Sequence, residues 1–461
     1  MLEITQKDLS SNRPSGIIRK ASLAFSWGLL VLLYIHTFTM IWKYSVNVPY
    51  WDEWEYFTAD ALPTGLTWHW LFKFHNEHRI VFTKLLAWMN LKIFGLNFAR
   101  QQIFNFGIYG CLLAAVFFLK VRIAGKDRFH LFPLFMLFLL SPLNYENHLW
   151  AFQSQFHLVM IFFILALISA FPKRLSGLSM LSFVIPVVLA IYSFSAGVIF
   201  AVVCTGFVLT YIAKSCLGDS GIKSRLLFQS AIMSAIICIA LLCWFQGYRK
   251  PPLHPELVTP FSTVFLDFFL GLAGFGFGYR PPSMAAGRLI GGISLISVLF
   301  PVLLLFADKK KRWLPSTWTV MSGTTATLVL LATISMARAE IEVPTVSRYN
   351  EFAVMLVPLA ALSWWLAVQQ KSLRTTILSL FWLFCLVGYF DRQSFSSYDQ
   401  VRSQRKSALE CISQYYAGSG DGICPMTYDQ PINGFLDRAK LLRVGFSSGS
   451  DFSEKLQLET K

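Results

Sequence analysis

Long apolar stretches, each nearly free of charge, are the feature that most constrains the fold of this chain. Residues 22–42, 228–244 and 318–337 are examples. A helix of about 20 residues rises about 1.5 Å per residue and so crosses the ~30 Å hydrocarbon core of a bilayer. In lipid, the backbone of such a segment satisfies its own hydrogen bonds only as a helix. We therefore predict an all-α fold, a polytopic bundle of about ten or eleven transmembrane helices.

The composition agrees with this prediction. Of the 461 residues, 55% are hydrophobic and only 14% are charged, whereas about a quarter of the residues in a soluble domain are charged. The formal net charge of +15 could indicate nucleic-acid binding. However, the Lys and Arg residues collect in short loops between apolar blocks, as the positive-inside rule requires of a membrane protein. This distribution argues against a nucleic-acid partner.

Basic loops alternate with loops poor in Lys and Arg, and this alternation predicts the topology. Residues 1–21 form a cytoplasmic segment, residues 22–390 a transmembrane domain, and residues 391–461 a small extracytoplasmic region. The apolar stretches 81–96 and 263–279 both lie between outer-face segments, so we interpret them as interfacial or re-entrant helices. The predicted spans are residues 22–42, 99–119, 131–143, 155–171, 177–194, 196–213, 228–246, 288–306, 317–337, 351–369 and 376–390, and the predicted cytoplasmic loops are 120–130, 173–174, 214–225, 308–312 and 371–374.

Two cysteines, Cys411 and Cys424, lie in the predicted extracytoplasmic region. In an oxidising compartment, two cysteines at this spacing could close a disulfide loop. The alternative is a pair of unrelated thiols, because the sequence does not give the geometry.

The first outer loop, residues 43–80, begins with an acidic and aromatic motif. Asp52, Glu53 and Glu55 stand among Trp and Tyr residues in the sequence Pro-Tyr-Trp-Asp-Glu-Trp-Glu-Tyr. Aromatic rings are common at the membrane interface, but clustered carboxylates are not needed there. We interpret the cluster as a base at the mouth of a pocket, with the pKa of one carboxyl raised by the aromatic surroundings and with Trp51 available to stack on a sugar. The alternative is a solvated loop anchored by its aromatic residues.

The same loop ends in His75-Asn76-Glu77-His78-Arg79. The spacing of the two histidines is not a strong zinc signature, and the sequence offers no second pair of ligands. We therefore favour a polar cluster, including His78, that binds a hydroxylated ligand. No cofactor is predicted, and a divalent metal here is the less favoured alternative. Arg79 could pair with a phosphate, or with Asp52 or Glu53.

Further candidates for substrate binding occur in the later outer segments. Trp150 and Gln153 belong to residue types that contact sugars, although they are equally ordinary at an interface. Cations should be rare on the outer face, and a phosphate at the interface would explain those present, because Arg binds phosphate with a planar fork. Lipid head-group contact is the alternative. These cations are Arg249, Lys250, Arg280, Arg338 and Arg348, the last followed by Tyr349.

Carboxylates and cations that face one pocket suit the transfer of a sugar from a lipid-phosphate donor. The phosphate is already a good leaving group, so the reaction needs no general acid. The site must supply positive charge for the departing phosphate and one base for the acceptor hydroxyl.

A cytoplasmic start, a first span and a long outer loop that opens with an acidic motif resemble the GT-C superfamily of polyprenyl-phosphate-sugar glycosyltransferases. Asp52 matches the acidic position of that family, with Glu53 as the neighbouring candidate. The sequences Tyr-Ser-Phe-Ser-Ala-Gly at 192–197 and Ser-Arg-Tyr at 347–349 are also similar to bacterial members.

The resemblance implies a bacterial inner-membrane hexosyltransferase with an inverting mechanism. It also implies a polyprenyl-phosphate sugar as donor and a lipid-linked glycan or another envelope molecule as acceptor, closest to O-antigen and other lipopolysaccharide glucosyltransferases. The C-terminal region is far smaller than in family members that modify proteins, which argues against a protein acceptor.

Two other functions fit part of the sequence. An O-antigen polymerase or ligase would also bind lipid-linked sugars, but its large loop usually comes late in the chain, whereas the long acidic loop comes first here. A transporter or flippase would carry ionisable residues in the middle of the membrane and inverted repeats. We find few such residues, His157 among them, and no repeat.

Overall fold

The computed structural model describes residues 16–125, 131–172, 176–216, 223–251, 255–390 and 393–447. The predicted cytoplasmic loop 173–174, most of segment 1–21 and the end of the C-terminal region lie outside these residues. Within the described residues, the regular structure is helical apart from one isolated bridge between His75 and His78. The predicted all-α class is confirmed.

The long helices of the bundle and the shorter helices of its loops follow one another along the chain. The bundle contains α1 (Gly16–Tyr44), α4 (Phe98–Ala124), α5 (Leu131–Leu139), α7 (Ser154–Ala170), α8 (Gly177–Ile191), α9 (Ala196–Cys216), α10 (Lys223–Phe245), α11 (Thr263–Gly276), α12 (Met284–Ala307), α13 (Pro315–Arg338), α14 (Ser347–Ala353), α15 (Leu356–Ala367) and α16 (Lys371–Tyr389). The first loop contains η1 (Trp51–Phe57), η2 (Leu62–Thr64), α2 (Trp68–Phe72) and α3 (Val81–Phe94). The remaining elements are η3 (Pro142–Asn144), α6 (Tyr145–Leu149), η4 (Ala151–Gln153), α17 (Gln393–Tyr416), α18 (Asn433–Leu441) and η5 (Gly445–Ser447).

Nine helices in the described part of the chain are long and apolar enough to cross a membrane. Of the eleven spans predicted from the sequence, nine match these helices, and the other two correspond to shorter helices. The span expected at 131–143 is α5, which has nine residues and ends shortly before Pro142. The span expected at 177–194 is α8, which has 15 residues, and at about 1.5 Å per residue it falls short of the hydrocarbon thickness.

Two apolar stretches were expected not to span, and both are short helices. α3 and α11 have 14 residues each. Ser262 caps α11 by accepting a hydrogen bond from the backbone N–H of Phe265 at 3.3 Å, and α11 ends where Gly278 takes a φ of +92°. A side chain at Gly278 would meet the backbone of Gly388 at 2.7 Å, so the turn packs tightly against α16.

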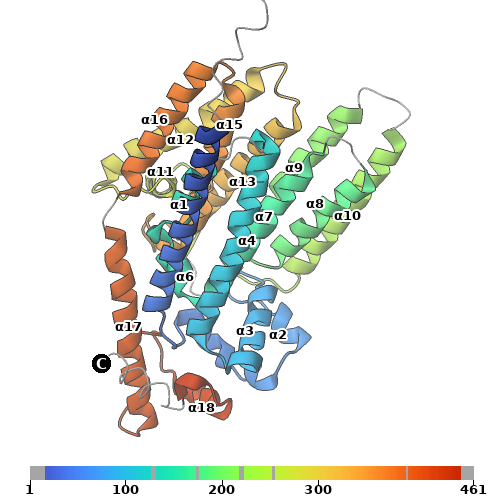
Figure 1. Cartoon of the computed structure of the whole chain (residues 1–461). Helices are drawn as coiled ribbons and strands as arrows, with labels where there is room; N and C mark the ends of the chain where they lie inside the picture. The colour runs from blue at the N-terminus through green and yellow to red at the C-terminus, as the bar shows by residue number, and fades with distance from the viewer. Residues whose placement is uncertain are drawn as a thin grey trace, which may run out of the picture.

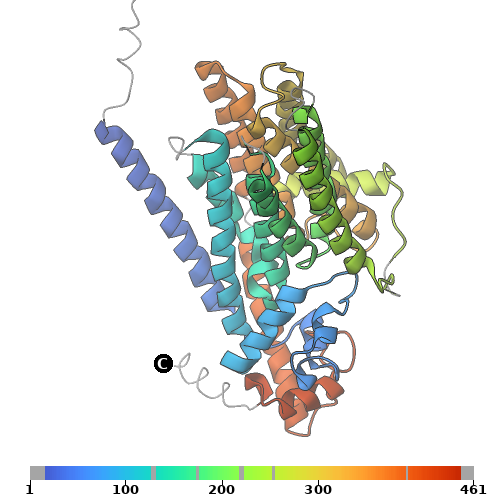
Figure 2. The same cartoon turned by 90° about the vertical axis from the view of Figure 1, so that its right-hand side faces the viewer.

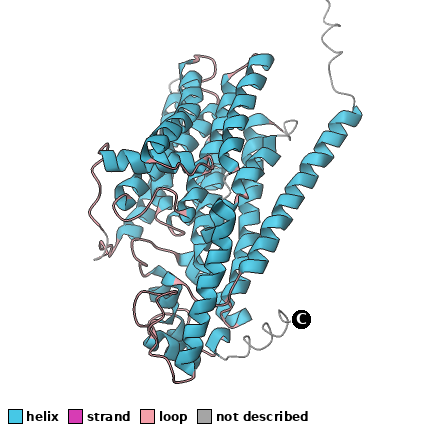
Figure 3. Ribbon diagram, turned by 90° about the vertical axis from the view of Figure 1, so that its left-hand side faces the viewer, coloured by secondary structure: helices cyan, strands magenta, loops and turns pink. Residues whose placement is uncertain are grey.

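The first loop and the C-terminal helices lie at one end of the bundle, opposite the start of α1 (Figures 1 and 2). The first half of α1 stands away from the other helices (Figures 2 and 3), and α1 is the least buried of the nine candidate spans, whereas α7 and the α14–α15 segment are the most buried. Within this arrangement, α7 packs against α4 and α8, and the short helix α6 packs against α14. The first loop therefore covers the end of the bundle at which α6, α7 and α14 begin.

The C-terminal region forms a small helical unit beneath the first loop (Figure 1). Cys411 of α17 and Cys424 form a disulfide, with their Cα atoms 5.8 Å apart. Helix α18 packs against η1 of the first loop. The acidic motif is thus enclosed between the membrane helices and the C-terminal unit.

Candidate active site

A cavity of about 730 Å³ lies where the first loop meets the bundle. Its walls come from the first loop, from α6 and η4, from the ends of α10 and α13, and from α14. Both short motifs that resemble the GT-C superfamily contribute, through Phe194 and Ser195 and through Arg348 and Tyr349. The lining residues include Trp51, Asp52, Glu77, His78, Glu146, Trp150, Gln153, Gln155, Phe194, Ser195, Trp244, Phe245, Arg338, Glu342, Arg348 and Tyr349.

Asp52 is the carboxylate of the acidic motif that lines this cavity. Its side chain is 32% exposed, and its Oδ2 lies 3.6 Å from Nε2 of the buried His75. The other ring nitrogen of His75 lies 2.9 Å from Oε2 of Glu55. Burial alone would lower the pKa of His75, but the two carboxylates outweigh it and raise the pKa to about 9. Burial also opposes the ionised form of Asp52, yet the hydrogen bond and charge of His75 lower the pKa of this carboxyl below its usual range.

Glu53, the second predicted catalytic residue, does not line the cavity. It is 1% exposed, and its two oxygens accept hydrogen bonds from the backbone N–H groups of Tyr50 and Phe152, both at 2.8 Å. Burial raises the pKa of Glu53 to about 8, opposed by the charge of Arg405. The sequence predicted a raised pKa for one carboxyl of this motif. In the structure the raised pKa belongs to Glu53, which binds the backbone N–H that follows Ala151 in η4, whereas the pKa of the cavity-facing Asp52 is lowered.

Two arginines predicted to bind phosphate, Arg338 and Arg348, line the same cavity as Asp52. Arg338 donates from Nη2 to Glu77 at 2.5 Å. The guanidinium of Arg348 contacts the carboxylates of Glu342 and Glu146, and its backbone N–H donates to Glu146 at 3.0 Å. These acidic partners hold both guanidinium groups in fixed orientations at the cavity wall.

Aromatic and amide side chains complete the wall. Trp51 is 41% exposed, and the indole N–H of the buried Trp150 donates to the Tyr50 carbonyl at 3.1 Å. Gln153 and Gln155 are 2% and 3% exposed, and the Oε1 atom of each is buried without a hydrogen-bond partner. Burial lowers the pKa of His78 to about 4, so this ring is neutral at physiological pH. The wall therefore offers hydrogen-bonding groups that a polar ligand would satisfy.

Five predicted substrate-binding residues lie elsewhere. Glu55 stands behind Asp52, bound to His75. Arg79 donates to the backbone carbonyls of Phe72, Trp244 and Gln246 and so caps the end of α10, which explains why it meets neither Asp52 nor Glu53. Arg249 and Lys250 are exposed, and Lys250 pairs with Glu256 at 2.6 Å. Arg280 stacks on the Phe275 ring at 5.7 Å.

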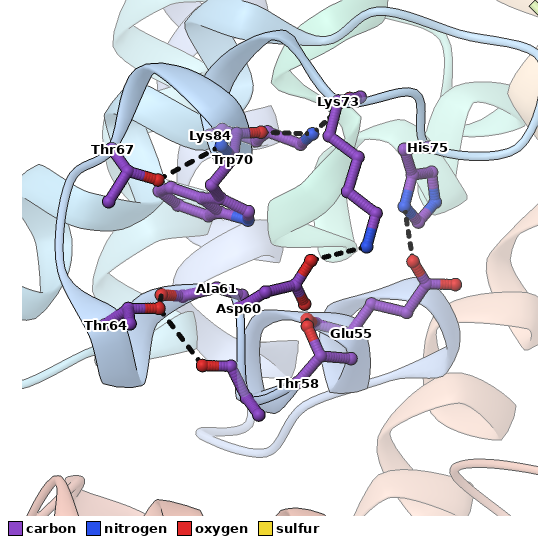
Figure 4. A network of polar contacts seen from close by, with 11 residues as sticks. Glu55, Thr58, Asp60, Ala61, Thr64, Thr67, Trp70, Lys73, His75 and Lys84 are labelled. Carbon is purple, nitrogen blue, oxygen red and sulfur yellow. Dashed lines mark hydrogen bonds and ion pairs between the residues drawn. The ribbon is translucent and has the colours of Figure 1, made fainter. Parts of the chain in front are cut away.

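A polar network in the first loop fixes the position of His75 (Figure 4). Thr67 caps α2 by accepting from the Trp70 N–H at 3.1 Å. At the other end of α2, the ammonium group of Lys84 donates to the carbonyls of Trp70 and Lys73 at 2.8 and 2.6 Å. Lys73 pairs with Asp60 at 2.6 Å. The loop between α2 and α3 is thus held at both ends, and His75 points from it towards Glu55.

One group in the described part of the chain could hold a metal ion. Asp52, Glu55 and His75 each offer a ligand atom, and these atoms lie within 4.8 Å of one another. The set differs from the His75, Glu77 and His78 cluster considered from the sequence, because His78 turns its ring against Phe194, with ring centroids 4.0 Å apart. Two carboxylates and one imidazole would suit a divalent cation.

Several residues of the site were not identified from the sequence. Glu146 and Glu342 bind the guanidinium group of Arg348. In the C-terminal unit, Thr427 accepts a hydrogen bond from the indole N–H of Trp54, and Arg405 donates to the Leu149 carbonyl. Only the Glu146 position, in a polar outer segment next to Trp150, carried a signal that could have drawn attention to it. The other three depend on contacts between segments far apart in the chain.

No family model matches this sequence, and no curated protein matches it. Among solved structures, the chain is similar to the crystal structure of ArnT from Cupriavidus metallidurans in the apo state. The two chains share 13% sequence identity with a TM-score of 0.44, and the match covers 93% of this chain and 78% of that one.

Proposed function

We propose that this chain is a membrane glycosyltransferase that moves a sugar from a polyprenyl-phosphate donor to an acceptor hydroxyl. The observation that carries the proposal is that Asp52 and the two arginines Arg338 and Arg348 line one cavity next to the apolar helices. Asp52 and Arg348 also interact electrostatically, because the positive charge of Arg348 contributes to the lowered pKa of Asp52. A base and a phosphate-binding pair that face one space are what this displacement requires.

In the proposed reaction, the acceptor oxygen attacks the anomeric carbon of the donor from the face opposite the phosphate. The bond between that carbon and the phosphate oxygen breaks, and the electron pair leaves with the lipid phosphate. Asp52 accepts the proton of the acceptor hydroxyl, and the guanidinium groups of Arg338 and Arg348 stabilise the phosphate charge. An oxocarbenium-like transition state is strongly electrophilic, so an ionised carboxylate of low pKa suffices as the base.

The sugar is proposed to lie between Trp51, Trp150 and the two glutamines. Aromatic faces suit the C–H face of a sugar ring. The unpartnered Oε1 atoms of Gln153 and Gln155 accept hydrogen bonds, which sugar hydroxyls donate. Leaving such buried acceptors unsatisfied costs about 1–3 kcal/mol each, so the ligand gains affinity by satisfying them.

The polyprenyl chain is proposed to lie along the apolar part of the wall. Val198, Ile199, Phe245, Leu330 and Ile334 line this part, and they belong to α9, α10 and α13, which are long enough to cross a membrane. The lipid would therefore remain among the membrane helices while its phosphate meets the arginines.

The finer assignments extend this proposal. The donor sugar is a hexose, the acceptor is a lipid-linked glycan of the O-antigen or lipopolysaccharide type, and the reaction proceeds with inversion. The N-terminus is cytoplasmic, and the cavity opens on the outer face of the bacterial inner membrane. Two facts support this orientation: the basic loop 308–312 lies at the end of the bundle opposite the cavity, and the Cys411–Cys424 disulfide, on the cavity side, needs an oxidising compartment.

The test is an assay of purified protein in lipid nanodiscs with a panel of polyprenyl-phosphate hexoses and a lipid-linked glycan acceptor. At least one donor should yield a glycosylated acceptor and free polyprenyl phosphate. An Asp399→Asn variant is the matched control for Asp52→Asn, because Asp399 is an exposed carboxylate of α17 that lies outside the cavity lining. Absence of transfer from every donor, with donor binding also absent, would refute the proposal.

One observation favours a second candidate, a transporter of lipid-linked sugars. His157 and Glu351 form a fully buried pair inside the bundle, with Nδ1 and Oε1 2.8 Å apart, and ionisable pairs at this depth often mark transport pathways. This pair does not line the cavity. A transporter would move the labelled donor across the membrane of a vesicle without breaking the sugar–phosphate bond, so analysis of the product separates the two functions.

A further inference from the structure

The segment 424–428 of the C-terminal unit lies directly against the acidic motif of the first loop. The backbone N–H of Trp51 donates to the Thr427 carbonyl at 2.8 Å. The Thr427 hydroxyl donates to the Pro49 carbonyl and accepts from the indole N–H of Trp54 at 3.0 Å. Thr427 is fully buried. Thr427 therefore contacts the motif on both sides of Asp52 in the sequence.

The backbone at Trp51 needs such support. Trp51 has a φ of +47°, a conformation that bulky residues rarely adopt and that persists only where the surroundings enforce it. The hydrogen bond to Thr427 comes from the N–H of this same residue. Because Asp52 follows immediately, the direction of its side chain depends on the conformation that Thr427 enforces.

The disulfide fixes the position of Thr427. The backbone N–H groups of Thr427 and Tyr428 both donate to the Cys424 carbonyl, at 3.0 and 3.1 Å, so the turn that carries Thr427 starts at the disulfide. Cys424 is joined to Cys411 of α17. Arg405 of α17 in turn donates to the Leu149 carbonyl of α6, next to the cavity wall. A continuous set of contacts thus runs from the wall through α17 and the disulfide to the acidic motif.

We propose that Thr427 is a positioning residue for Asp52 and that sugar transfer requires the Cys411–Cys424 disulfide. The inference rests on the proposed function. Oxidised, the disulfide keeps the 424–428 turn against the motif, and Asp52 faces the cavity. A dithiol reagent reduces the disulfide to two thiols and is itself oxidised to a cyclic disulfide. The turn then loses its link to α17, Trp51 relaxes from its positive φ, and Asp52 leaves the attacking position.

The first experiment compares Thr427→Val, which keeps the shape and removes the hydroxyl, with Thr427→Ser, which keeps the hydroxyl. The Val variant should lower kcat about tenfold or more, because small displacements of a reacting group have effects of this size. The KM for the donor should stay within about twofold, since the arginines are untouched. The Ser variant should restore most of kcat. A Val variant with the kcat of the wild type, or a Ser variant as impaired as Val, would overturn the role of the hydroxyl.

The second experiment adds a readout that does not depend on catalysis. Hydrogen exchange of the peptide covering residues 49–57 is measured with and without dithiothreitol, and in a Cys411→Ser, Cys424→Ser variant. Reduction and the double variant should both speed exchange of the Trp51 amide, and both should lower kcat. The reagent should have no effect on the double variant, which excludes action through other cysteines.

The two experiments separate the two proposals. Unchanged exchange and unchanged kcat after complete reduction would overturn the inference while leaving the proposed function intact. Faster exchange after reduction, in a protein without transferase activity towards any donor, would support the contact and refute the proposed function.

Discussion

Raising the pH should weaken the site by removing the proton that His75 holds between Asp52 and Glu55. The pKa of His75 is raised from 6.5 to about 9 in the folded protein. A raised folded-state pKa means that the stabilisation is complete below about pH 6.5 and is lost as the pH rises through about 9. Each pKa unit corresponds to about 1.4 kcal/mol, so this proton contributes about 3 kcal/mol to the stability of the folded site. His75 is only 5% exposed, so solvent screening reduces this figure little.

The assay follows thermal unfolding of the wild type and of a His75→Gln variant in detergent, from pH 6 to pH 9.5, by tryptophan fluorescence. Glu53 and Lys84 also have shifted pKa values, about 8 and about 7, but both proteins contain them, so their titration cancels in the difference. The wild type should be more stable at pH 6, and its advantage should shrink by about 3 kcal/mol by pH 9.5. In the activity profile, the acidic limb should move to higher pH in the variant, because burial then acts on Asp52 without the opposing hydrogen bond and charge of His75. A difference in stability that stays constant over this range would refute the pairing of His75 with the two carboxylates.

Three further outcomes are expected. Arg348→Gln should raise the KM for the donor about 10- to 100-fold, because a charge-assisted hydrogen bond to phosphate is lost; the exposed Arg249→Gln variant should leave the KM unchanged, and equal KM values would remove Arg348 from the phosphate site. Activity should survive thorough chelation, because in the proposed reaction the two arginines stabilise the phosphate charge; loss of activity, with recovery on adding a divalent cation, would instead assign a metal to Asp52, Glu55 and His75. Glu351→Gln should destabilise the bundle by about 1–3 kcal/mol, because it disturbs the buried hydrogen bond with His157; a melting temperature equal to that of the wild type would show that this contact does not stabilise the bundle.

The membrane architecture could be predicted from the sequence because it follows from local properties. A long run of apolar residues without charges indicates a span directly, so nine of the eleven predicted spans coincide with long helices of the described residues. The apolar stretches at α3 and α11 were predicted not to span. The errors at α5 and α8 have a local origin as well. Hydrophobicity continues past the residues at which these helices end, so the apolar stretch is longer than the helix.

The site was only partly predictable, because its geometry depends on contacts between distant segments. The acidic motif indicated a base, but adjacent carboxylates point in different directions, and only the fold shows that Asp52 faces the cavity while Glu53 binds backbone N–H groups of Tyr50 and Phe152. Likewise, an outer-face arginine looks the same in sequence whether it meets a ligand or caps a helix. Arg348 lies in the cavity wall, whereas Arg79 caps α10.

The most direct test of the account is the turnover of Asp52→Asn with the donor identified from the panel. The amide is nearly isosteric with the carboxylate but cannot accept the acceptor proton, so single-turnover transfer should fall by about 10²-fold or more, while donor binding and the unfolding temperature stay close to those of the wild type. Transfer at the wild-type rate by a folded Asp52→Asn protein would contradict the assignment of Asp52 as the base.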